Sequence, residues 1–578
     1  MKRVQLNENA LVVAKNRYFF DEENWETCVT RVANTISLPE SNNRQKISDA
    51  FADMVYNMDF LPGGRILRNC GRPRGSLFNC YHLPVGDSIE EIGQFIKDSL
   101  ILWSEGGGVG CNFTPLRPRG DIILGKGGKS SGLVSFIEAA DAVAKTIESG
   151  GARRAAAIAH VDITHPEVMD FIDAKVVDGR ISSFNISVAV NEDFLTAVEE
   201  DDKWTFKFKQ KDYSSVRARD LWEKIVTNMI ECAEPGLINW TNFQKNNSYY
   251  FEPVLGTNPC GETTLGPYGV CDLGSLVLPN FITGNVNTNW IKLQTTIKTA
   301  VRFLDNVIEV NKYTLKDIDI NAHKSRRIGV GVIGLAEYLF AKKVIYGSEK
   351  AVAETERLMR FIRDSVYQAS VELAIEKGAF AAFNPIPYGK ASFVRKLPAS
   401  LRMDIKKYGI RNCTLMALAP TGTISLLTDY SSAIEPLFAK AMKRKDRVSE
   451  RVYIHPSYQE MIEKGEEIPD WFVDSYDLKP KDHFEMQVAC QRYCDASVSK
   501  TINLPKETTD EDLSNLLLEY IHDLKGVTVY RDGSKAGQIL NRMTDEEARN
   551  YILNDTGTKV ESNMEPENVT CANGSCEI

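Results

Sequence analysis

Apolar residues after Ser88 recur at the three-to-four spacing of one helical face, at Ile89, Ile92, Phe95, Ile96 and Trp103. Ser88 and Glu91 form an S-x-x-E capping box before this stretch, and a run of three glycines follows it. A helix is therefore predicted between the capping box and the glycines. The same signal at Ser135 and Glu138 predicts a second helix that runs to Ser149.

Short apolar runs bounded by turn residues predict strands between the helices. Residues 77–83 form such a run and predict a short buried strand. Residues 61–67 predict a turn that leads into another strand, and residues 1–60 are predicted to be mainly helical. Strand, helix and glycine turn then alternate to about residue 540, which indicates an α/β fold class.

Composition places the chain among globular proteins with a large core. It has 578 residues, of which 43% are hydrophobic and 25% charged. No apolar run approaches the roughly 20 residues that span a bilayer, and residues 10–14 are too short for a signal peptide, so a cytoplasmic protein is expected. The net charge of −9 argues against nucleic-acid binding, so an anionic substrate needs local donors.

Twelve cysteines in a chain without a secretion signal do not indicate a disulfide framework. Cys490 and Cys494 could bind a metal from one helical face, but no His or Cys pair completes such a site, which favours core packing. From Asn554 the chain is polar and is predicted to be a flexible tail. Its Cys571 and Cys576 suit thiol–disulfide exchange, although incidental tail cysteines are the alternative. Scattered buried thiols are predicted at Cys28, Cys70, Cys232 and Cys413.

Three glycine-containing segments raise the question of nucleotide binding. Residues 329–334 match a dinucleotide fingerprint but follow a basic stretch instead of a strand, so close backbone packing is favoured. Residues 125–130 fail the P-loop spacing and leave only a glycine-rich loop. Residues 419–425 lie between two apolar runs and predict a strand-to-helix turn, which is either a phosphate cradle or an ordinary capped turn.

The stretch Asn258-Pro259-Cys260-Gly261-Glu262 places an amide, a thiol and a carboxylate at alternating positions. In an extended segment, side chains two apart point to the same side, so these three groups are predicted to converge on one small ligand. Pro259 and Gly261 shape the backbone between them. Another thiol, Cys271, follows nine residues after Glu262.

Several ordered motifs together resemble the catalytic subunits of ribonucleotide reductases. They are Gly64 to Leu67, Asn79-Cys80, Leu116 to Gly120, Asn258 to Glu262, Cys271 to Ser275, Arg327 to Gly331, Pro420 to Ser425, Asp495 to Pro505 and the terminal cysteine pair. The resemblance implies a ten-stranded α/β barrel with a central finger loop over residues 61–540. The small helical N-terminal region, residues 1–60, would precede the barrel, and a redox tail, residues 541–578, would follow it.

The resemblance also implies roles for the thiols and their neighbours. A thiyl radical on Cys260 would abstract the 3′-hydrogen of a ribonucleotide, and Glu262 would act as general base. Asn258 would hold the substrate hydroxyls, while Cys80 and Cys271 would donate two electrons and close as a disulfide. The tail pair, Cys571 and Cys576, would reduce that disulfide and pass the oxidation to a thioredoxin or glutaredoxin-type reductant. Substrate-binding residues carried over are Asn79, Pro259, Gly261, Pro420, Thr421, Gly422, Thr423 and Ile424.

Two features favour the class II enzymes, whose cofactor is adenosylcobalamin. Pro259 stands where class I subunits usually carry Leu, and Tyr530 is single where class I subunits place two adjacent tyrosines. The chain lacks an Asp-x-His-x-x-Gly cobalamin motif, as class II reductases do. The alternatives are a class I large subunit that needs a separate radical-generating subunit, and a thiol–disulfide or metal-handling protein. No metal site is assigned.

Regulation follows from the resemblance only in part. Asp87 and Arg117 match positions that help bind a dNTP or ATP specificity effector, and the loops 126–132 and 150–157 match those that link effector to substrate choice. A homodimer and ribonucleoside diphosphate substrates are expected. Cys111 stands where the family usually has an apolar or small residue.

Overall fold

The computed structural model describes most of the chain. The described residues are 5–123, 127–149, 153–177, 179–284, 286–445, 450–533 and 540–554. The tail cysteines Cys571 and Cys576, parts of the loops 126–132 and 150–157, and the glycine-rich residues 125–126 lie outside them. In this part of the chain, no helix is both long and apolar enough to cross a bilayer.

A ten-stranded sheet forms the centre of the molecule, in the order β1-β13-β2-β3-β6-β7-β10-β20-β19 with β16 beside β13. Its strands are β1 (Phe60–Pro62), β2 (Cys80–His82), β3 (Gly108–Asn112), β6 (Ala156–Asp162), β7 (Phe184–Val190), β10 (Gly236–Asn239), β13 (Gly269–Val277), β16 (Ile328–Ile333), β19 (Thr501–Leu504) and β20 (Gly526–Arg531). Neighbours from β2 to β10 are parallel, as are β13 with β16 and β19 with β20. The two parallel halves meet antiparallel at β2–β13 and at β10–β20.

Residues 415–418 close this sheet into a barrel. Met416 pairs with Val330 of β16, and Leu418 pairs with Val498, just before β19. The backbone N–H of Val330 donates to the carbonyl of Leu415, and that of Leu418 to the carbonyl of Ser497. The α/β barrel expected from the sequence is therefore confirmed.

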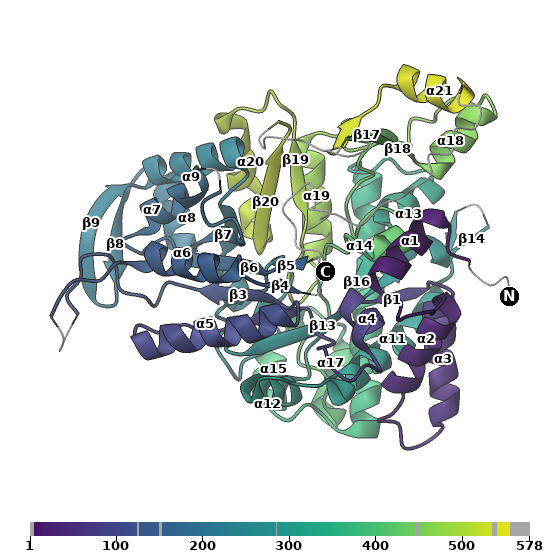
Figure 1. Cartoon of the computed structure of the whole chain (residues 1–578), viewed down its shortest axis with the longest axis horizontal. Helices are drawn as coiled ribbons and strands as arrows, with labels where there is room; N and C mark the ends of the chain where they lie inside the picture. The colour runs from purple at the N-terminus through teal and green to yellow at the C-terminus, as the bar shows by residue number, and fades with distance from the viewer. Residues whose placement is uncertain are drawn as a thin grey trace.

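Helices cover the outside of the barrel (Figure 1). They include α5 (Ile89–Ser104), α6 (Leu133–Ala144), α7 (Val168–Ile172), α8 (Glu192–Glu199), α9 (Ala218–Cys232), α11 (Trp290–Val310), α12 (Lys316–Ser325), α13 (Leu335–Ala341), α14 (Glu349–Lys377), α19 (Pro480–Gln491) and α20 (Asp510–Tyr520). In α11 the residues Leu293, Ile297, Ala300, Leu304 and Ile308 are all buried. Their helical spacing gives α11 one apolar face, which packs on β13 and β16.

Smaller elements lie around the barrel. The hairpin of β8 (Lys203–Phe208) and β9 (Lys211–Arg217) extends at one end, and β17 (Ala441–Lys445), β18 (Glu450–Ile454) and β21 (Leu540–Arg542) form a sheet at the other (Figure 1). Near this sheet lie α18 (Pro456–Glu463) and α21 (Asp545–Asn554). Further helices are α4 (Gly64–Asn69), α10 (Trp240–Lys245), α15 (Pro385–Lys390), α16 (Ser392–Arg395) and α17 (Ala399–Tyr408).

The first predicted helix is confirmed as α5. The hydroxyl of its N-cap Ser88 accepts a hydrogen bond from the backbone N–H of Glu91. The Glu91 carboxylate accepts from that hydroxyl and not from the backbone N–H of Ser88, so the capping box is only half formed. The second prediction was wrong in both bounds: α6 begins at Leu133 and ends at Ala144. The hydroxyl of Ser135 donates to the carbonyl of Ser131, so it is already part of the helix and caps nothing.

Two further local predictions have opposite outcomes. Residues 61–67 were wrongly predicted, because the strand β1 precedes the turn and α4 follows it. The glycine-rich residues 329–334 do pack closely, as favoured: a Cβ at Gly329 would lie 2.8 Å from the Cβ of Ala417, and one at Gly331 would lie 2.8 Å from its carbonyl oxygen. The glycines of this strand, β16, therefore face the closing segment. The apolar residues between them, such as Val330, face the core.

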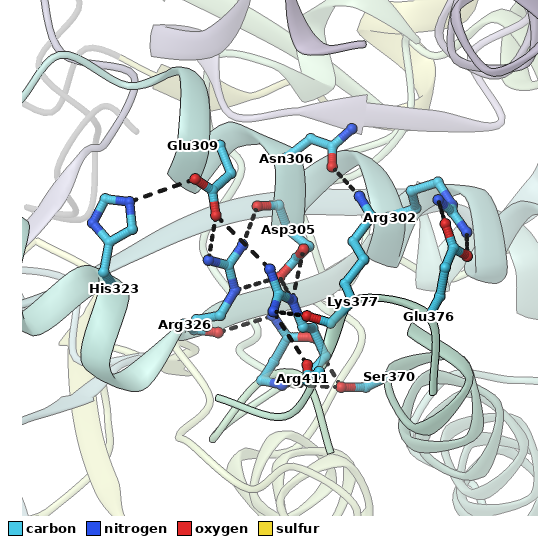
Figure 2. A network of polar contacts seen from close by, with 12 residues as sticks. Arg302, Asp305, Asn306, Glu309, His323, Arg326, Ser370, Glu376, Lys377 and Arg411 are labelled. Carbon is cyan, nitrogen blue, oxygen red and sulfur yellow. Dashed lines mark hydrogen bonds and ion pairs between the residues drawn. The ribbon is translucent and has the colours of Figure 1, made fainter. Parts of the chain in front are cut away.

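The N-terminal residues are helical as predicted and pack on α11. Their helices are α1 (Glu8–Arg17), α2 (Trp25–Ile36) and α3 (Arg44–Tyr56). Glu40, which lies between α2 and α3, is buried and accepts hydrogen bonds from Asn306 of α11 and Lys377 of α14. Figure 2 shows Asn306 and Lys377 beside the ion pair of Arg302 with Glu376, so one polar network joins these helices.

Asp305 is the centre of that network (Figure 2). Its buried carboxylate accepts hydrogen bonds from Arg326 at 2.8 Å, from Arg411 at 3.1 Å and from Asn412 at 3.1 Å. Burial alone would raise the pKa of Asp305, but the guanidiniums of Arg326 and Arg411 hold it below its usual value. The network thus fastens α11 to the end of α12 and to the segment that leads into the closing strand.

Asp305→Asn should lower the free energy of unfolding by about 3–5 kcal/mol at pH 7, because two buried guanidiniums lose their carboxylate. Urea unfolding followed by circular dichroism measures the change. The pKa of Asp305 is lowered in the folded protein, so the difference should begin to shrink below about pH 4, where the unfolded state takes up the proton. It should be lost once the pH is low enough to protonate the folded carboxylate as well.

The matched control is Glu376→Gln, which removes the half-exposed partner of Arg302 on the same network. It should cost no more than about 1 kcal/mol. Equal losses in the two variants would contradict the central role of Asp305.

Candidate active site

The finger loop runs through the interior of the barrel. It rises through β11 (Gly256–Thr257), turns, and returns through β12 (Thr264–Leu265). The turn is closed by the N–H of Gly261, which donates to the carbonyl of Asn258 at 3.0 Å, and Gly261 has a φ of +80°. Residues other than glycine are disfavoured at this backbone conformation.

Glycines of β3 make room for this loop. A Cβ at Gly108 would lie 2.9 Å from Cγ of Pro259, and one at Gly110 would lie 1.7 Å from the carbonyl oxygen of Thr257. On the return side, the N–H of Ser497 donates to the carbonyl of Glu262 at 2.8 Å. The finger loop is therefore held between β3 and the residues that precede β19.

Asn258 and Glu262 converge as the sequence predicted, but by a different geometry. The turn folds the chain back, so the Asn258 amide donates to the Glu262 carboxylate at 2.8 Å and to the sulfur of Cys80 at 3.2 Å. The Cys80 thiol also reaches the carboxylate, at 3.5 Å. Thr263 fixes the other end of the amide, because its N–H and hydroxyl both donate to the Asn258 oxygen.

Cys80 and Cys271 lie directly opposite each other in the β2–β13 pair. Both are buried in a small cluster with Leu273, Ala417 and Ala419, and the half-buried Cys260 packs against that cluster. Burial raises the pKa of Cys271, and the nearby Asp272 raises it further, so this thiol is protonated at neutral pH. The three cysteines that the sequence singled out in the barrel are therefore brought together.

Glu262 is fully buried, and burial raises its pKa to about 7, although hydrogen bonds from Asn258 and Cys80 favour the charged form. A carboxylate with a pKa near neutral pH can accept and return a proton during one reaction cycle. One of its oxygens, Oε2, has no hydrogen-bond partner among the described residues. The group is thus poised as a general base.

An open pocket lies on another side of Cys260. It is lined by the finger loop, by β7, β10 and β20, and by Ser499 and Lys500. Its polar side chains include Asn185, Ser187 and Thr528. Cys260 therefore borders both the buried thiol pair and this pocket.

The segment 419–425 follows the closing strand, as predicted, and leads into the 3-10 helix η3 (Ser425–Leu427). Thr421 has a φ of +56° and its hydroxyl accepts from the N–H of Ala433 at 2.8 Å. Thr423 and Ile424 are buried, whereas Pro420 and Gly422 are half-buried. Ala417 and Ala419 of the thiol cluster connect directly to this loop, so it begins next to Cys80 and Cys271.

Asn79 precedes Cys80, and its Oδ1 is buried with no hydrogen-bond partner in the part of the chain that the structure describes. An unpaired carbonyl oxygen of this kind is ready to accept a hydrogen bond from a ligand. The substrate-binding role expected of Asn79 stays a prediction.

Asp87, just before α5, and Arg117, after β3, bind each other. Arg117 Nε is 3.0 Å from Oδ1 and 3.1 Å from Oδ2 of Asp87, and its backbone N–H donates to the same carboxylate. Burial alone would raise the pKa of Asp87, but the Arg117 guanidinium holds that pKa below its usual value. Lys209, at the tip of the β8–β9 hairpin, reaches Asp87 at 3.4 Å, a contact that sequence reasoning missed because the two residues are 122 positions apart.

The other cysteines among the described residues lie outside the thiol cluster. Cys111 is fully buried in the large hydrophobic core, in the alternate register to Gly108 and Gly110 of its strand. Cys490 and Cys494 also belong to that core, as favoured, and so do Cys28, Cys70 and Cys413. Cys232 is half-buried at the end of α9.

Two family descriptions match the chain. "Ribonucleotide reductase, barrel domain" matches residues 78–530, and "Ribonucleotide reductase, all-alpha domain" matches residues 4–75. The chain belongs to the ribonucleotide reductase family. This result confirms the resemblance drawn from the motifs and assigns the barrel and its finger loop to a reductase.

Relatives of this reductase carry two kinds of name. A "Vitamin B12-dependent ribonucleoside-diphosphate reductase" of Thermoplasma acidophilum is 34% identical over 91% of the chain and 71% of that protein. One of the same name from Mycobacterium tuberculosis is 33% identical over 93% of the chain and 81% of that protein. A "Ribonucleoside-diphosphate reductase subunit alpha" of Chlamydia trachomatis is 28% identical over 77% of the chain and 48% of that protein.

The pH dependence of the reductase should report the Glu262 carboxylate. Because its pKa is about 7 and the base must be ionised, kcat/KM should rise about tenfold per pH unit below pH 7 and level off above it. Initial rates of deoxyribonucleotide formation at low substrate concentration between pH 5.5 and 8.5 measure this rise, the acidic limb of the pH profile.

Asn258→Ala distinguishes Glu262 from the substrate's own phosphate, which titrates near pH 6. The amide of Asn258 favours the charged carboxylate, so its removal should move the limb to higher pH as well as lower the rate. A limb that stays at the same pH in this variant would belong to the substrate instead.

Proposed function

We propose that this reductase is an adenosylcobalamin-dependent, class II enzyme that converts ribonucleoside diphosphates to 2′-deoxyribonucleoside diphosphates. The observation that carries the proposal is the position of Cys260, between the paired thiols Cys80 and Cys271 and an open pocket. A radical cysteine needs this arrangement, because it must meet the substrate, the reductant and the source of the radical. The two B12-dependent relatives, at 33–34% identity, support the class.

The residues around the thiol divide the reaction between them. Cys260 removes the 3′-hydrogen atom of the ribose, Glu262 takes the 3′-hydroxyl proton, and Asn258 orients the hydroxyls. Cys80 and Cys271 then supply two electrons and two protons: the 2′-hydroxyl leaves as water, a hydrogen takes its place on the 2′-carbon, and the two thiols close as a disulfide. Glu262 and Cys260 return the proton and the hydrogen atom that they took from the 3′-position. Their opposite positions on β2 and β13 suit that closure.

The pocket beside Cys260 suits the adenosyl end of the cofactor. Its wall combines main chain at Gly236 with the polar side chains of Asn185, Ser187 and Thr528, a donor set that suits a nucleoside group. Asn185, Ser187 and Thr528 would hold the ribose and base by hydrogen bonds. When bound, adenosylcobalamin supplies the one-electron chemistry that converts a thiol to a thiyl radical.

Substrate phosphates would be held by the loop from Pro420 to Ile424, which includes Thr421, Gly422 and Thr423. The loop starts at the thiol cluster, and its half-buried Pro420 and Gly422 leave backbone accessible. Asn79, with its unpaired buried oxygen, and the finger residues Pro259 and Gly261 would complete the substrate contacts.

Regulation and recycling involve residues farther away. The Asp87–Arg117 pair would bind a dNTP or ATP specificity effector at a homodimer interface. Cys571 and Cys576 would reduce the Cys80–Cys271 disulfide and pass the oxidation to a thioredoxin or glutaredoxin-type reductant in the cytoplasm. We assign residues 1–60 to the helical region, 61–540 to the barrel domain and 541–578 to the redox tail.

The test is to assay the single purified chain with cytidine diphosphate, adenosylcobalamin and a dithiol. Deoxycytidine diphosphate should form without a second protein subunit, and cytidine triphosphate should be a poorer substrate. Strict dependence on a metal-containing radical subunit would exclude class II.

Cys260→Ser should abolish this reduction while a mild oxidant still links Cys80 to Cys271, as peptide mass spectrometry would show. Cys28→Ala, which changes a buried thiol of α2, is the matched control and should keep its activity. Turnover by the Cys260 variant would disprove the radical mechanism.

A further inference from the structure

Two histidines flank the start of the finger loop. A Cβ at Gly256 would lie 2.7 Å from Nε2 of His82 and 2.7 Å from Nδ1 of His160. Both imidazoles are fully buried, and they come from different strands, β2 and β6. The main chain at Gly256 therefore passes through a gap that only glycine fits.

The strand between the two histidines explains this gap. In the register of the sheet, His82 lies opposite Gly110 of β3, and His160 lies opposite Asn112 of the same strand. Gly110 has no side chain, and the carbonyl of Thr257 occupies the space above it. The loop thus lies in a groove whose floor is β3 and whose sides are the two imidazole rings.

Among the described residues, only one of the four ring nitrogens of His82 and His160 has a hydrogen-bond partner. Nε2 of His160 is 3.0 Å from the Thr257 hydroxyl. Its Nδ1 and both ring nitrogens of His82 have no hydrogen-bond partner among the described residues. Burying such groups costs about 1–3 kcal/mol each, so an apolar side chain would be cheaper if the groove served only to fill space.

Both rings are uncharged. Burial lowers the pKa of His82 to about 3 and that of His160 to about 3, and the neighbouring His82 disfavours a charge on His160 further. No other charged group contributes to either shift. A neutral His160 can therefore hold the Thr257 hydroxyl at any pH near neutrality.

We propose that His82 and His160 are positioning residues that clamp the finger loop at Gly256 and Thr257 and so set the place of the Cys260 thiol. Thr257 directly precedes the turn of Asn258 to Gly261, so a shift at the clamp moves the whole turn. Misplacement of a reacting group by about 1 Å can lower a rate about 100-fold. The catalytic consequence rests on the proposed function, whereas the clamp itself does not.

The accessibility of Cys260 gives a readout that needs no cofactor. The rate of its alkylation by iodoacetamide, measured by peptide mass spectrometry, should rise several-fold in His160→Leu, which loses the bond to Thr257. His160→Gln can restore that bond and should stay close to wild type. His165→Leu is the matched control, because His165 is also buried but bonds the carbonyl of Leu116, away from the loop.

Kinetics of the full chain provide the second readout. In His160→Leu, kcat should fall about 10- to 100-fold while KM changes much less, because the turn that carries the thiol moves and the phosphate-binding loop from Pro420 to Ile424 stays in place. Unchanged alkylation and unchanged kcat in this variant would overturn the clamp. If alkylation changes but the parent chain shows no reductase activity, the proposed function fails and the clamp stands.

Gly256→Ala keeps the proposal testable if His160→Leu does not fold. The added methyl should raise Cys260 alkylation in the wild-type background and raise it less in His82→Ala, which removes one of the two rings it meets. Additive effects of the two substitutions would show that the histidine and the loop do not press on each other, and would contradict the clamp.

Discussion

The finger loop inside the barrel depends on glycines in the wall where its main chain passes closest, and this steric constraint shapes the centre of the molecule. Gly108 and Gly110 of β3 leave the space that Pro259 and Thr257 fill. Gly329 of β16 leaves comparable space for Leu273, and its absent Cβ would lie 3.4 Å from the sulfur of Cys271. Gly108 and Gly110 each give up a side-chain contact in the wall, and the loop replaces those contacts with Pro259 and the Thr257 main chain.

The same enclosure sets the electrostatics of the site. Removing Glu262 from water raises its pKa to about 7, whereas the Asn258 amide and the Cys80 thiol moderate the shift by donating to the carboxylate. Burial also keeps Cys271 protonated. One physical cause, desolvation, thus yields a proton acceptor and a hydrogen-bearing thiol in the same small space.

Much of this could be predicted from the sequence, because the informative residues are close together along the chain. The helix at α5 and the strand at Cys80 follow from local patterns, whereas Asn258 and Glu262 meet through a turn and not through the alternation of an extended segment. The convergence of Cys80 with Cys271, which are 191 positions apart, came only from resemblance, since spacing carries no information on strand register. Ser135 misled because a Ser-x-x-Glu pair inside a helix has the same letters as one at its start.

Other features had no local signal at all. Nothing near Gly256 in the sequence indicates that His82 and His160 lie on its two sides, because the contact depends on three strands and their register. The contact of Lys209, at the tip of the β8–β9 hairpin, with Asp87 likewise has no local signal, because the two residues are far apart in the sequence. Long-range pairing, unlike helix capping, is decided by the whole fold.

The order of the segments along the chain has a consequence for assembly. The wall strands β2, β3 and β6 and the finger loop all precede residue 266, whereas the closing segment 415–418 and the strands β19 and β20 come last. A ring closed early would force the loop to be threaded through it. If the segments assemble in chain order, the finger loop packs on an open half-barrel first. The closing segment, β19 and β20 then dock over it and complete the barrel.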